Sequence, residues 1–337
     1  MLLPLIGALA AGNCVLVKPS EIAPHTSKLI AEWLPRYVDG SAVKVMEGGV
    51  PETTALLAQQ WDHIFYTGNG MVGRIVMEAA AKHLTPVTLE LGGKSPCIVD
   101  RNVDIDVAAK RIVFGKFFNA GQTCVAPDYV LADDQVYDAL VNRMGAVIRE
   151  FYGENPKQNP DFGRIINERH HARLTKLLES GELAFGGDVD VSERYIAPTI
   201  LKNVKPDEPV MQDEIFGPIL PVLSVRDVDS AISFVNRRPK PLALYVLSDD
   251  KATQERVLQR TSSGGTTVNH VWMHLGVPEL PFGGVGESGM GAYHGKYSFD
   301  VFSHRRSVLK KKLGKEPPIM YPPYTKLKYR LVKLLSR

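Results

Sequence analysis

Short apolar runs rich in valine and isoleucine alternate with amphipathic segments of helical length along the first 130 residues. This alternation is typical of β-α units, in which each strand is followed by a helix that crosses back over the sheet. Such a repeat has few stable arrangements other than a mostly parallel sheet with helices packed on its faces. The chain is therefore predicted to be an α/β protein.

The same patterns place the individual elements. The first series of predicted strands comprises Cys14–Lys18, Val43–Met46, His63–Tyr66, Val87–Leu89 and Cys97–Val99. The predicted helices between and after them are Thr26–Leu34, Glu52–Gln60, Val72–His83 and Val107–Asn119. A second αβ series contains helices at Gln135–Glu150, His170–Glu179, Val228–Asn236 and Lys251–Arg260, with strands at Ile196–Leu201, Ile219–Leu223 and Leu242–Leu247.

Length and composition set the class of protein. The chain has 337 residues, of which 44% are hydrophobic and 23% charged, which fits two ordinary globular domains and excludes a disordered chain. The early apolar run Leu2–Val17 is broken by Pro4, Gly7 and Gly12, so it is too short to be predicted as a membrane-spanning helix. No Lys or Arg precedes this run, which argues against a secretory signal.

The basic charge is confined to the end of the chain. Residues 305–337 contain 11 Lys and Arg against one acid, a balance of +10, while the rest has 29 bases and 36 acids, a balance of −7. Nucleic-acid binding is not predicted, because the positive charge does not cover a folded face. Leucines and tyrosines alternate with bases over Lys326–Arg337, a pattern that fits weak peripheral contact with an anionic membrane. A solvated tail or a subunit clasp is favoured, since Pro322 and Pro323 leave only a short helix.

The three cysteines differ in their surroundings. An odd number in a chain of this length argues against a disulfide framework and indicates a reducing, cytoplasmic location. Cys14 and Cys97 lie in apolar runs, where a thiol packs as a small hydrophobic group. Cys124 lies in the loop AGQTCVAP, bounded by glycine and proline, and is the candidate reactive thiol. Taken alone, a loop cysteine is either a nucleophile or inert, and the motif by itself leaves both open.

An acidic residue near a pair of glycines is the second candidate. Glu90 closes an apolar run and precedes Gly92 and Gly93. A carboxylate in this place can point into a cleft at the carboxyl edge of a parallel sheet, where α/β folds bind their ligands. The alternative is a solvated glutamate at the end of a strand.

Two further patterns are weak on their own. Residues 68–73 spell G-x-G-x-x-G between a predicted strand and a predicted helix, as in dinucleotide-binding loops. His270 and His274 have the spacing of a helical metal pair, but no HExxH or CxxC motif accompanies them and Gly276 and Pro278 argue against a helix. No metal site is predicted.

Five motifs in order carry a resemblance to a known family. They are PSEIAP at 19–24, ELGGKSP at 90–96, FNAGQTCVAP at 118–127, DEIFGP at 213–218 and PFGGVGESGMG at 281–291. Together they resemble the aldehyde dehydrogenase superfamily, and TCVAPDYV, YIAPTIL and FSHRRS resemble its class 3 or fatty-aldehyde branch. The resemblance implies a Rossmann-like NAD(P)-binding domain over residues 1–91, incomplete at its N-terminus, an α/β catalytic domain over 92–300 and a basic C-terminal arm over 301–337.

The resemblance assigns a role to each candidate. Cys124 matches the nucleophile that adds to the aldehyde carbon, and Glu90 matches the base that activates water to hydrolyse the resulting thioester. Lys18 and Glu21 match the family positions that hold the adenosine ribose. The loop at the pyrophosphate is matched by Gly68, Asn69, Gly70 and Gly73. Glu214 and Phe216 match the residues at the nicotinamide ribose and ring, Phe282 matches an aromatic residue of the aldehyde channel, and Asn269 matches an asparagine that supports the site.

The motifs also admit less specific interpretations, which stay open at this point. Lys18 and Glu21 also fit an ordinary turn at the end of a strand, and the DEIFGP segment fits a loop with a buried phenylalanine. A carboxylate at Glu21 disfavours a 2′-phosphate, so NAD is the first expectation and NADP the second.

The implied activity is oxidation of medium-chain, long-chain or aromatic aldehydes to carboxylic acids by a homodimer. The backbone N–H of Cys124 is one expected oxyanion donor, while the family's second donor is an asparagine upstream of the first residue here. Loss of one such donor costs about 10²–10³-fold in kcat, so a weak enzyme is expected. The alternatives are an esterase that uses only the thiol and an inactive fragment.

Overall fold

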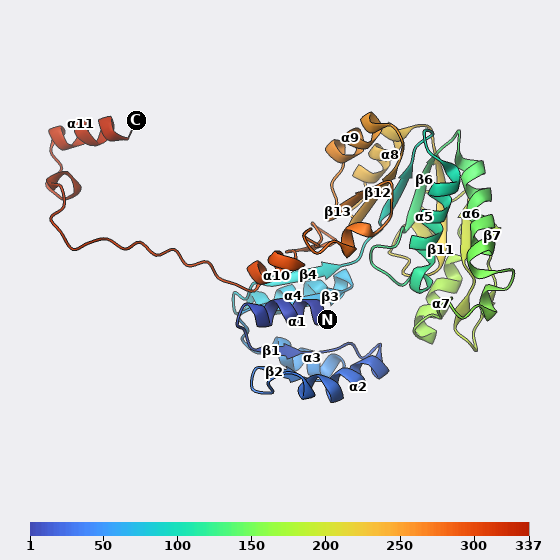
Figure 1. Ribbon diagram of the computed structural model, residues 1–337, viewed down its shortest axis with the longest axis horizontal. Coiled ribbons are helices and arrows are strands. Elements are labelled where there is room, and N and C mark those ends of the chain that lie inside the picture. The colour runs from blue at the N-terminus through green and yellow to red at the C-terminus, as the bar shows by residue number, and fades with distance from the viewer. Residues whose placement is uncertain (337) are drawn as a thin grey trace. The chain divides into compact units, whose positions relative to one another are not determined.

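A seven-stranded sheet forms the centre of the fold. The computed structural model describes residues 1–336 and divides into a large unit, residues 1–303, and a terminal unit that begins at residue 304 (Figure 1). The strand order of the sheet is β13-β12-β5-β6-β11-β10-β7, and every neighbouring pair is parallel except β10 with β7. The strands are β5 Pro96–Val99, β6 Tyr129–Asp133, β7 Glu182–Phe185, β10 Thr199–Lys202, β11 Ile219–Val225, β12 Ala243–Leu247 and β13 Gly265–Val268.

Helices cover both faces of this sheet because the order of the strands first advances toward one edge of the sheet and then toward the other. From β5 to β6 the chain moves toward β11, and from β11 through β12 to β13 it moves the opposite way. Right-handed crossovers therefore put the helices of the two series on opposite faces. The helices of this part are α5 Ile105–Phe117, α6 Tyr137–Tyr152, α7 Glu168–Leu177, α8 Val228–Asn236 and α9 Lys251–Arg260. The strands are buried on both sides and form the main core.

The first 91 residues form two smaller sheets (Figure 1). One is the parallel pair β1-β2, and in the other β4 pairs in parallel with β3 and antiparallel with β14. The elements are α1 Leu2–Ala10, β1 Val15–Val17, α2 Pro24–Trp33, β2 Val43–Val45, α3 Val50–Leu57, β3 Ile64–Gly68, α4 Gly70–Ala81 and β4 Val87–Leu91. The segment that closes the large unit adds β14 Gly289–Met290 and α10 Gly295–Val301, while β8 Val189–Asp190 and β9 Tyr195–Ile196 form a short separate pair.

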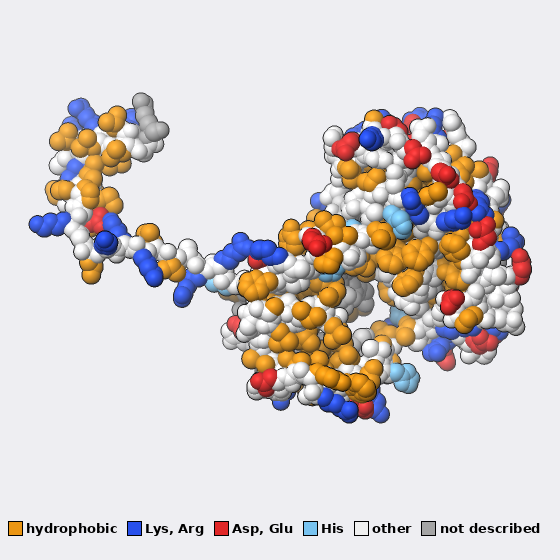
Figure 2. All heavy atoms as spheres, in the orientation of Figure 1, with side chains coloured by type: hydrophobic (Ala, Val, Ile, Leu, Met, Phe, Trp, Pro, Cys, Tyr) orange, Lys and Arg blue, Asp and Glu red, His pale blue; other side chains and the backbone are white. Residues whose placement is uncertain are grey.

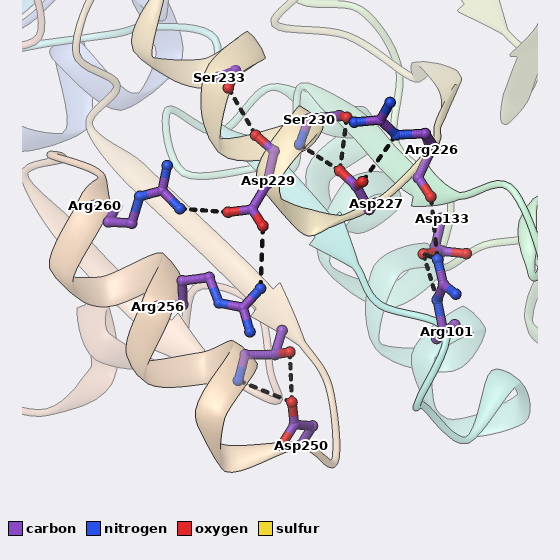
Figure 3. A network of polar contacts seen from close by, with 11 residues as sticks. Arg101, Asp133, Arg226, Asp227, Asp229, Ser230, Ser233, Asp250, Arg256 and Arg260 are labelled. Carbon is purple, nitrogen blue, oxygen red and sulfur yellow. Dashed lines mark hydrogen bonds and ion pairs between the residues drawn. The ribbon is translucent and has the colours of Figure 1, made fainter.

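The carboxyl edge of the large sheet is held by ion pairs and helix caps (Figure 3). Asp227 caps α8 by accepting from the Ser230 N–H at 2.8 Å, and Asp250 caps α9 in the same way. Asp229 on α8 pairs with both Arg256 and Arg260 on α9. These groups are paired with one another, so this edge has a structural role.

The terminal unit contains α11, Lys326–Leu335, which Thr325 caps. Its leucines and Tyr329 are exposed. Figure 2 shows hydrophobic side chains mixed with Lys and Arg side chains over this helix. Within residues 1–336, no helix has both the length and the apolar character needed to cross a membrane.

Most predicted elements are present, with differences at their ends. The single strand predicted at Ile196–Leu201 is wrong, because the chain leaves β9 after Ile196 and enters β10 of the large sheet at Thr199. The strand predicted to end at Leu89 runs to Leu91, so Glu90 lies inside it. The helix predicted to reach Asn119 ends at Phe117, because Asn119 and Ala120 adopt left-handed φ values of 52° and 51°. Cys97 is buried as predicted, whereas Cys14 is exposed, since it precedes the first residue of β1. The predicted domain boundary after residue 91 falls between β4 and β5 and stays a prediction.

The turn after α5 yields a test of the fold. Gly121 has a φ of +72°, and a Cβ there would lie 2.2 Å from the carbonyl oxygen of Gly217. Both features disfavour a side chain. We expect Gly121→Ala to lower the free energy of unfolding by about 2 kcal/mol or more, measured by urea denaturation. Gly40→Ala is the control, because a Cβ at Gly40 meets no atom within 4 Å. Equal stabilities of the two variants would contradict this account of the turn.

Candidate active site

Glu90 is a buried carboxylate on the face of β4 that turns away from the helix. Leu89 and Leu91 pack with Val76 of α4, so alternation along the strand directs Glu90 to the other side. Its side chain is 3% exposed, and neither oxygen has a hydrogen-bond partner among the described residues. Burial raises the pKa of Glu90 from 4.5 to about 8. Such a carboxyl is largely protonated at neutral pH and is poised to exchange a proton.

The loop that carries Cys124 is fixed by the side chain of Gln122. The Gln122 amide donates to the carbonyls of Asn119 at 3.2 Å and Arg164 at 3.0 Å, and its oxygen accepts from the Ile166 N–H at 3.0 Å. The hydroxyl of Tyr245 on β12 donates to the carbonyl of Val125. These bonds hold the residues on both sides of the thiol, so the loop is rigid where it precedes β6.

The thiol of Cys124 is partly exposed and lies near two carboxylates. Burial, followed by the charges of Glu214 and Glu90, raises the pKa of Cys124 from 9.0 to about 12. The backbone N–H groups of Cys124 and Val125 face the sulfur and act in the opposite direction. They are the groups that can stabilise a negative charge at this point.

Glu214 lies on the DEIFGP loop, which leads into β11. Its carboxylate oxygen occupies the space that a Cβ of Gly92 would fill, at 1.8 Å. Burial is the main cause that raises the pKa of Glu214 to about 8, with the charge of Asp128 second. Phe216, two residues further on, has a left-handed φ of 48° and is 39% exposed. The backbone of this loop is therefore strained at Phe216.

A buried ion pair clamps this loop to the cysteine loop. Asp128 accepts from the Ile215 N–H at 2.9 Å and pairs with the ammonium of Lys94. Lys94 also donates to the carbonyls of Val210 at 2.8 Å and Asp213 at 3.0 Å. Arg173 on α7 adds donors to the carbonyls of Glu214 and Ile215.

Close backbone contacts bring the predicted motifs together. The carbonyl of Gly217 lies against Gly121, the carboxylate of Glu214 lies against Gly92, and Gly289 of β14 pairs with Glu90. Tyr293 follows β14. Burial, followed by the charges of both Glu90 and Cys124, raises the pKa of Tyr293 to about 12. The predicted thiol and base therefore share one neighbourhood, which lies at the carboxyl end of β4 but at the amino ends of β5, β6 and β11. The sequence predicted a site at the carboxyl edge of a parallel sheet. This is correct for the small sheet that contains β4, whereas in the large sheet the site lies at the amino edge.

The residues predicted to bind the adenosine ribose and the pyrophosphate lie around the start of α4. Lys18 and Glu21 form a salt bridge of 2.8 Å. Burial and the charge of Glu21 both raise the pKa of Tyr66. The Tyr66 hydroxyl occupies the space that a Cβ of Gly68 would fill. Asn69 caps the helix by accepting from the Val72 N–H at 2.9 Å.

This segment fits a bound dinucleotide. A Cβ at Gly70 would meet only the flexible end of Arg74 within 4 Å, which leaves room beside the first N–H groups of α4 for an anion. Gly73 packs against Leu91, where a Cβ would lie 2.8 Å from a leucine methyl group, so this glycine sets the distance between helix and strand. Lys18 and Glu21 supply a donor and an acceptor of the kind that bind a pair of ribose hydroxyls.

Aromatic side chains form a second group near the thiol. Trp272 stacks on Phe114, with ring centroids 5.4 Å apart, and contacts Phe118 at 5.3 Å. Phe118 begins the turn that leads to Cys124 and is 50% exposed. Predicted Phe282 is buried between His274 and His294 and touches Tyr293 edge-on.

Asn269 lies at the carboxyl end of β13, three residues before Trp272. Its side-chain oxygen accepts from the Ser248 N–H at 2.9 Å, and its carbonyl accepts from Arg111. These contacts join two strands and α5, so the structure gives Asn269 a role in packing, and its predicted support of the site stays a prediction. Among residues 1–336, no group of His, Cys, Asp and Glu is arranged to hold a metal ion. A surface hollow of about 430 Å³, lined by residues such as Arg149 and Tyr195, contains none of the predicted site residues.

Sequence reasoning missed several residues of the site. Lys94 lies within ELGGKSP and Asp128 within TCVAPDYV, and the signal that could have found this pair is a charged residue inside an otherwise apolar motif. Lys116 interrupts the apolar end of α5 and is fully buried. Phe114 and Trp272 come from separate elements, so only the fold brings them together.

Comparisons with known proteins match this geometry to one family. The model of the aldehyde dehydrogenase family matches residues 1–308. Aldehyde dehydrogenase family 3 member A2 of Mus musculus is 57% identical over 332 residues, covering 98% of this chain and 69% of the relative. The dimeric NADP-preferring aldehyde dehydrogenase of Rattus norvegicus is 56% identical over 322 residues, covering 95% and 71%. A solved structure of the substrate-bound state of Staphylococcus aureus AldH is 50% identical, with a TM-score of 0.95, covering 99% of this chain and 73% of that one.

The raised pKa of Glu90 predicts how stability depends on pH. A carboxyl whose pKa rises from 4.5 to about 8 on folding favours the folded state fully below pH 4.5, and this contribution is lost as the pH rises through 8. Glutamine does not titrate, so the stability of Glu90→Gln relative to the parent should increase between pH 5 and pH 9, by a few kcal/mol as an order of magnitude. Urea denaturation at several pH values measures this difference. A difference that is constant over the range would mean that Glu90 is not buried as described.

Proposed function

Because the chain belongs to the aldehyde dehydrogenase family, we propose that it oxidises apolar aldehydes to carboxylic acids with NAD(P)⁺ through a thioester on Cys124, which Glu90 helps to hydrolyse. The observation that carries the proposal is the convergence of a thiol and a buried carboxyl of raised pKa in one neighbourhood. The family match and the close relatives support NAD(P) as cofactor and aldehyde oxidation as the reaction.

In the first step the thiol of Cys124 releases its proton to solvent, the sulfur bonds to the aldehyde carbon, and the carbonyl oxygen gains a negative charge. The N–H groups of Cys124 and Val125, which face the sulfur, are placed to donate to this oxygen. Bound NAD(P)⁺ would supply the acceptor for the hydride that leaves the carbon. Lys18, Glu21, Glu214 and the start of α4 are the groups proposed to hold it.

In the second step Glu90 takes a proton from water, which attacks the carbon of the thioester. The carbon–sulfur bond breaks and the carboxylic acid forms. The sulfur takes up the proton from Glu90, which restores the thiol of Cys124 and the base. A base with a pKa of about 8 is better matched to this transfer than one at 4.5. Glu90 therefore acts in hydrolysis of the thioester and is not needed for its formation.

The aromatic group supports apolar aldehydes as substrates. Phe114, Phe118 and Trp272 form a partly exposed face at the start of the turn that leads to Cys124. An alkyl chain or an aromatic ring gains apolar contact on such a face, whereas a short aldehyde does not reach it.

The predictions about assembly and location stay predictions. A homodimer is supported by the name of the dimeric rat relative. The exposed leucines and bases of α11 fit weak contact with an anionic membrane by an otherwise cytoplasmic enzyme.

Pre-steady-state kinetics test the two catalytic roles. Cys124→Ser should abolish NAD(P)H formation from aldehyde. Glu90→Gln should keep a rapid burst of about one NAD(P)H per site, while the steady rate falls by about 10²–10⁴-fold and no longer rises with pH through about 8. Loss of the burst in Glu90→Gln would contradict the proposed order of steps. Ester hydrolysis without NAD(P)H formation would support the alternative of an esterase.

Substrate chain length tests the aromatic face. Trp272→Ala should raise KM for a long-chain aldehyde by about tenfold, the equivalent of about 1.4 kcal/mol of lost apolar contact, and leave KM for propanal nearly unchanged. Tyr37→Ala, at an exposed aromatic residue between α2 and β2, is the matched control. Equal effects on both aldehydes would exclude the proposed role of this face.

A further inference from the structure

Arg74 lies one turn into α4, and its side chain folds back over the start of the helix. Its guanidinium donates to the carbonyl of Gly70 at 3.2 Å, and its Nη1 atom is 3.4 Å from the position that a Cβ of Gly70 would take. Long side chains on a helix point toward its N-terminus, which agrees with this arrangement. The guanidinium therefore borders the space beside the first N–H groups of α4.

The other side of the guanidinium pairs with Glu287, which lies 213 residues further along the chain in the segment PFGGVGESGMG. The side chains of Arg74 and Glu287 are 60% and 59% exposed. An exposed pair of this kind adds little to stability, because water solvates both charges when the pair separates. The guanidinium can therefore change its partner with little loss of free energy.

The backbone around Glu287 is fixed on β4. The hydroxyl of Ser288 accepts from the Val285 N–H at 2.9 Å, and the carbonyl of Ser288 accepts from the Leu91 N–H at 3.1 Å. Leu91 in turn packs against Gly73 in the first part of α4. The exposed carboxylate of Glu287 is thus held within reach of Arg74 by backbone contacts that do not depend on the ion pair.

The start of α4 still has hydrogen-bond donors for an anion. Asn69 accepts from the Val72 N–H at 2.9 Å, whereas the N–H groups that precede it in the helix have no acceptor within the helix. An arginine binds phosphate oxygens in pairs through its planar fork, and the helix dipole favours the same negative charge. A pyrophosphate at this point is therefore a stronger partner for Arg74 than the carboxylate of Glu287.

We propose that Arg74 binds the pyrophosphate of the cofactor by an exchange of partners: its guanidinium pairs with Glu287 in the free protein and with phosphate oxygens when the dinucleotide is bound. The inference rests on the proposed function in placing the pyrophosphate at the start of α4. It adds a ligand from outside residues 68–73 and makes Glu287 a competitor for that ligand.

Calorimetric titration of the cofactor-free protein with ADP tests the exchange, with adenosine as the probe that lacks phosphate. Arg74→Gln should weaken ADP binding by about tenfold, the size of effect expected for a lost hydrogen bond to a charged group, and change adenosine binding by less than about twofold. Glu287→Gln should strengthen ADP binding by about threefold, because the guanidinium no longer has to leave a carboxylate.

Lys82→Gln is the matched control. Lys82 follows the last residue of α4, so this variant removes the same charge from the opposite end of the helix. That end is about 18 Å away, beyond the range of an exposed charge at ordinary ionic strength, so ADP affinity should stay within about twofold. An equal loss in Lys82→Gln and Arg74→Gln would assign the effect to net charge and overturn the proposal.

The double variant separates an exchange of partners from simple repulsion. Glu287→Gln should add nothing in the Arg74→Gln background, because Glu287 acts only by holding Arg74. A gain that persists without Arg74 would mean that Glu287 repels the phosphates directly, and it would overturn the exchange. An unchanged ADP affinity in Arg74→Gln would exclude Arg74 as a ligand.

Folding and function are distinguished from the exchange. Both side chains are exposed, so thermal melting should be nearly unchanged in each single variant. Equal losses of ADP and adenosine binding in Arg74→Gln would mean that the whole start of α4 is disturbed and would reject the proposal. Aldehyde oxidation with NAD(P)⁺ by a protein whose ADP affinity ignores Arg74 would refute this inference alone. The expected ADP changes in a protein that does not oxidise aldehydes would refute the proposed function alone.

Discussion

The buried pair of Asp128 and Lys94 is the interaction on which the site depends. It ties together three segments that are distant in sequence: Lys94 follows the strand of Glu90, Asp128 follows Cys124, and both bind the backbone around Glu214. Removing one partner would leave an uncompensated charge, which typically costs about 3–5 kcal/mol. The geometry of the thiol and the two glutamates is therefore inseparable from the stability of the large sheet.

Much of the fold could be predicted because the chain is locally consistent. Hydrophobic periodicity and β-α alternation located the strands and helices, since each buried element shows its pattern in sequence. The ends of elements depended on contacts that the pattern does not contain. Helix α5 stops at Phe117 because Asn119 and Ala120 take left-handed conformations, which the hydrophobic pattern does not encode.

The candidate site could be predicted in its residues but not in its geometry. Family motifs pointed to Cys124, Glu90 and Glu214, which the structure brings together. They also pointed to Asn269, whose contacts join β12, β13 and α5 and whose support of the site stays a prediction. The amino edge of the large sheet was not predicted as the site, because the sequence does not state how two separate sheets meet. Lys116 shows the same limit, since a lysine in an apolar helix end signals burial but not its partner.

The arrangement of charges has a consequence for how one site performs two chemical steps. Formation of a thiolate is opposed by negative charge at Glu90 and Glu214, while hydrolysis needs Glu90 as an ionised base. Burial reduces this conflict, because a carboxyl with a pKa of about 8 is mostly neutral at pH 7 and repels the thiolate little. Once the thioester has formed, the sulfur carries no charge, and ionisation of Glu90 becomes easier. The same low-polarity environment that weakens the acid at rest thus makes it a suitable base when hydrolysis begins.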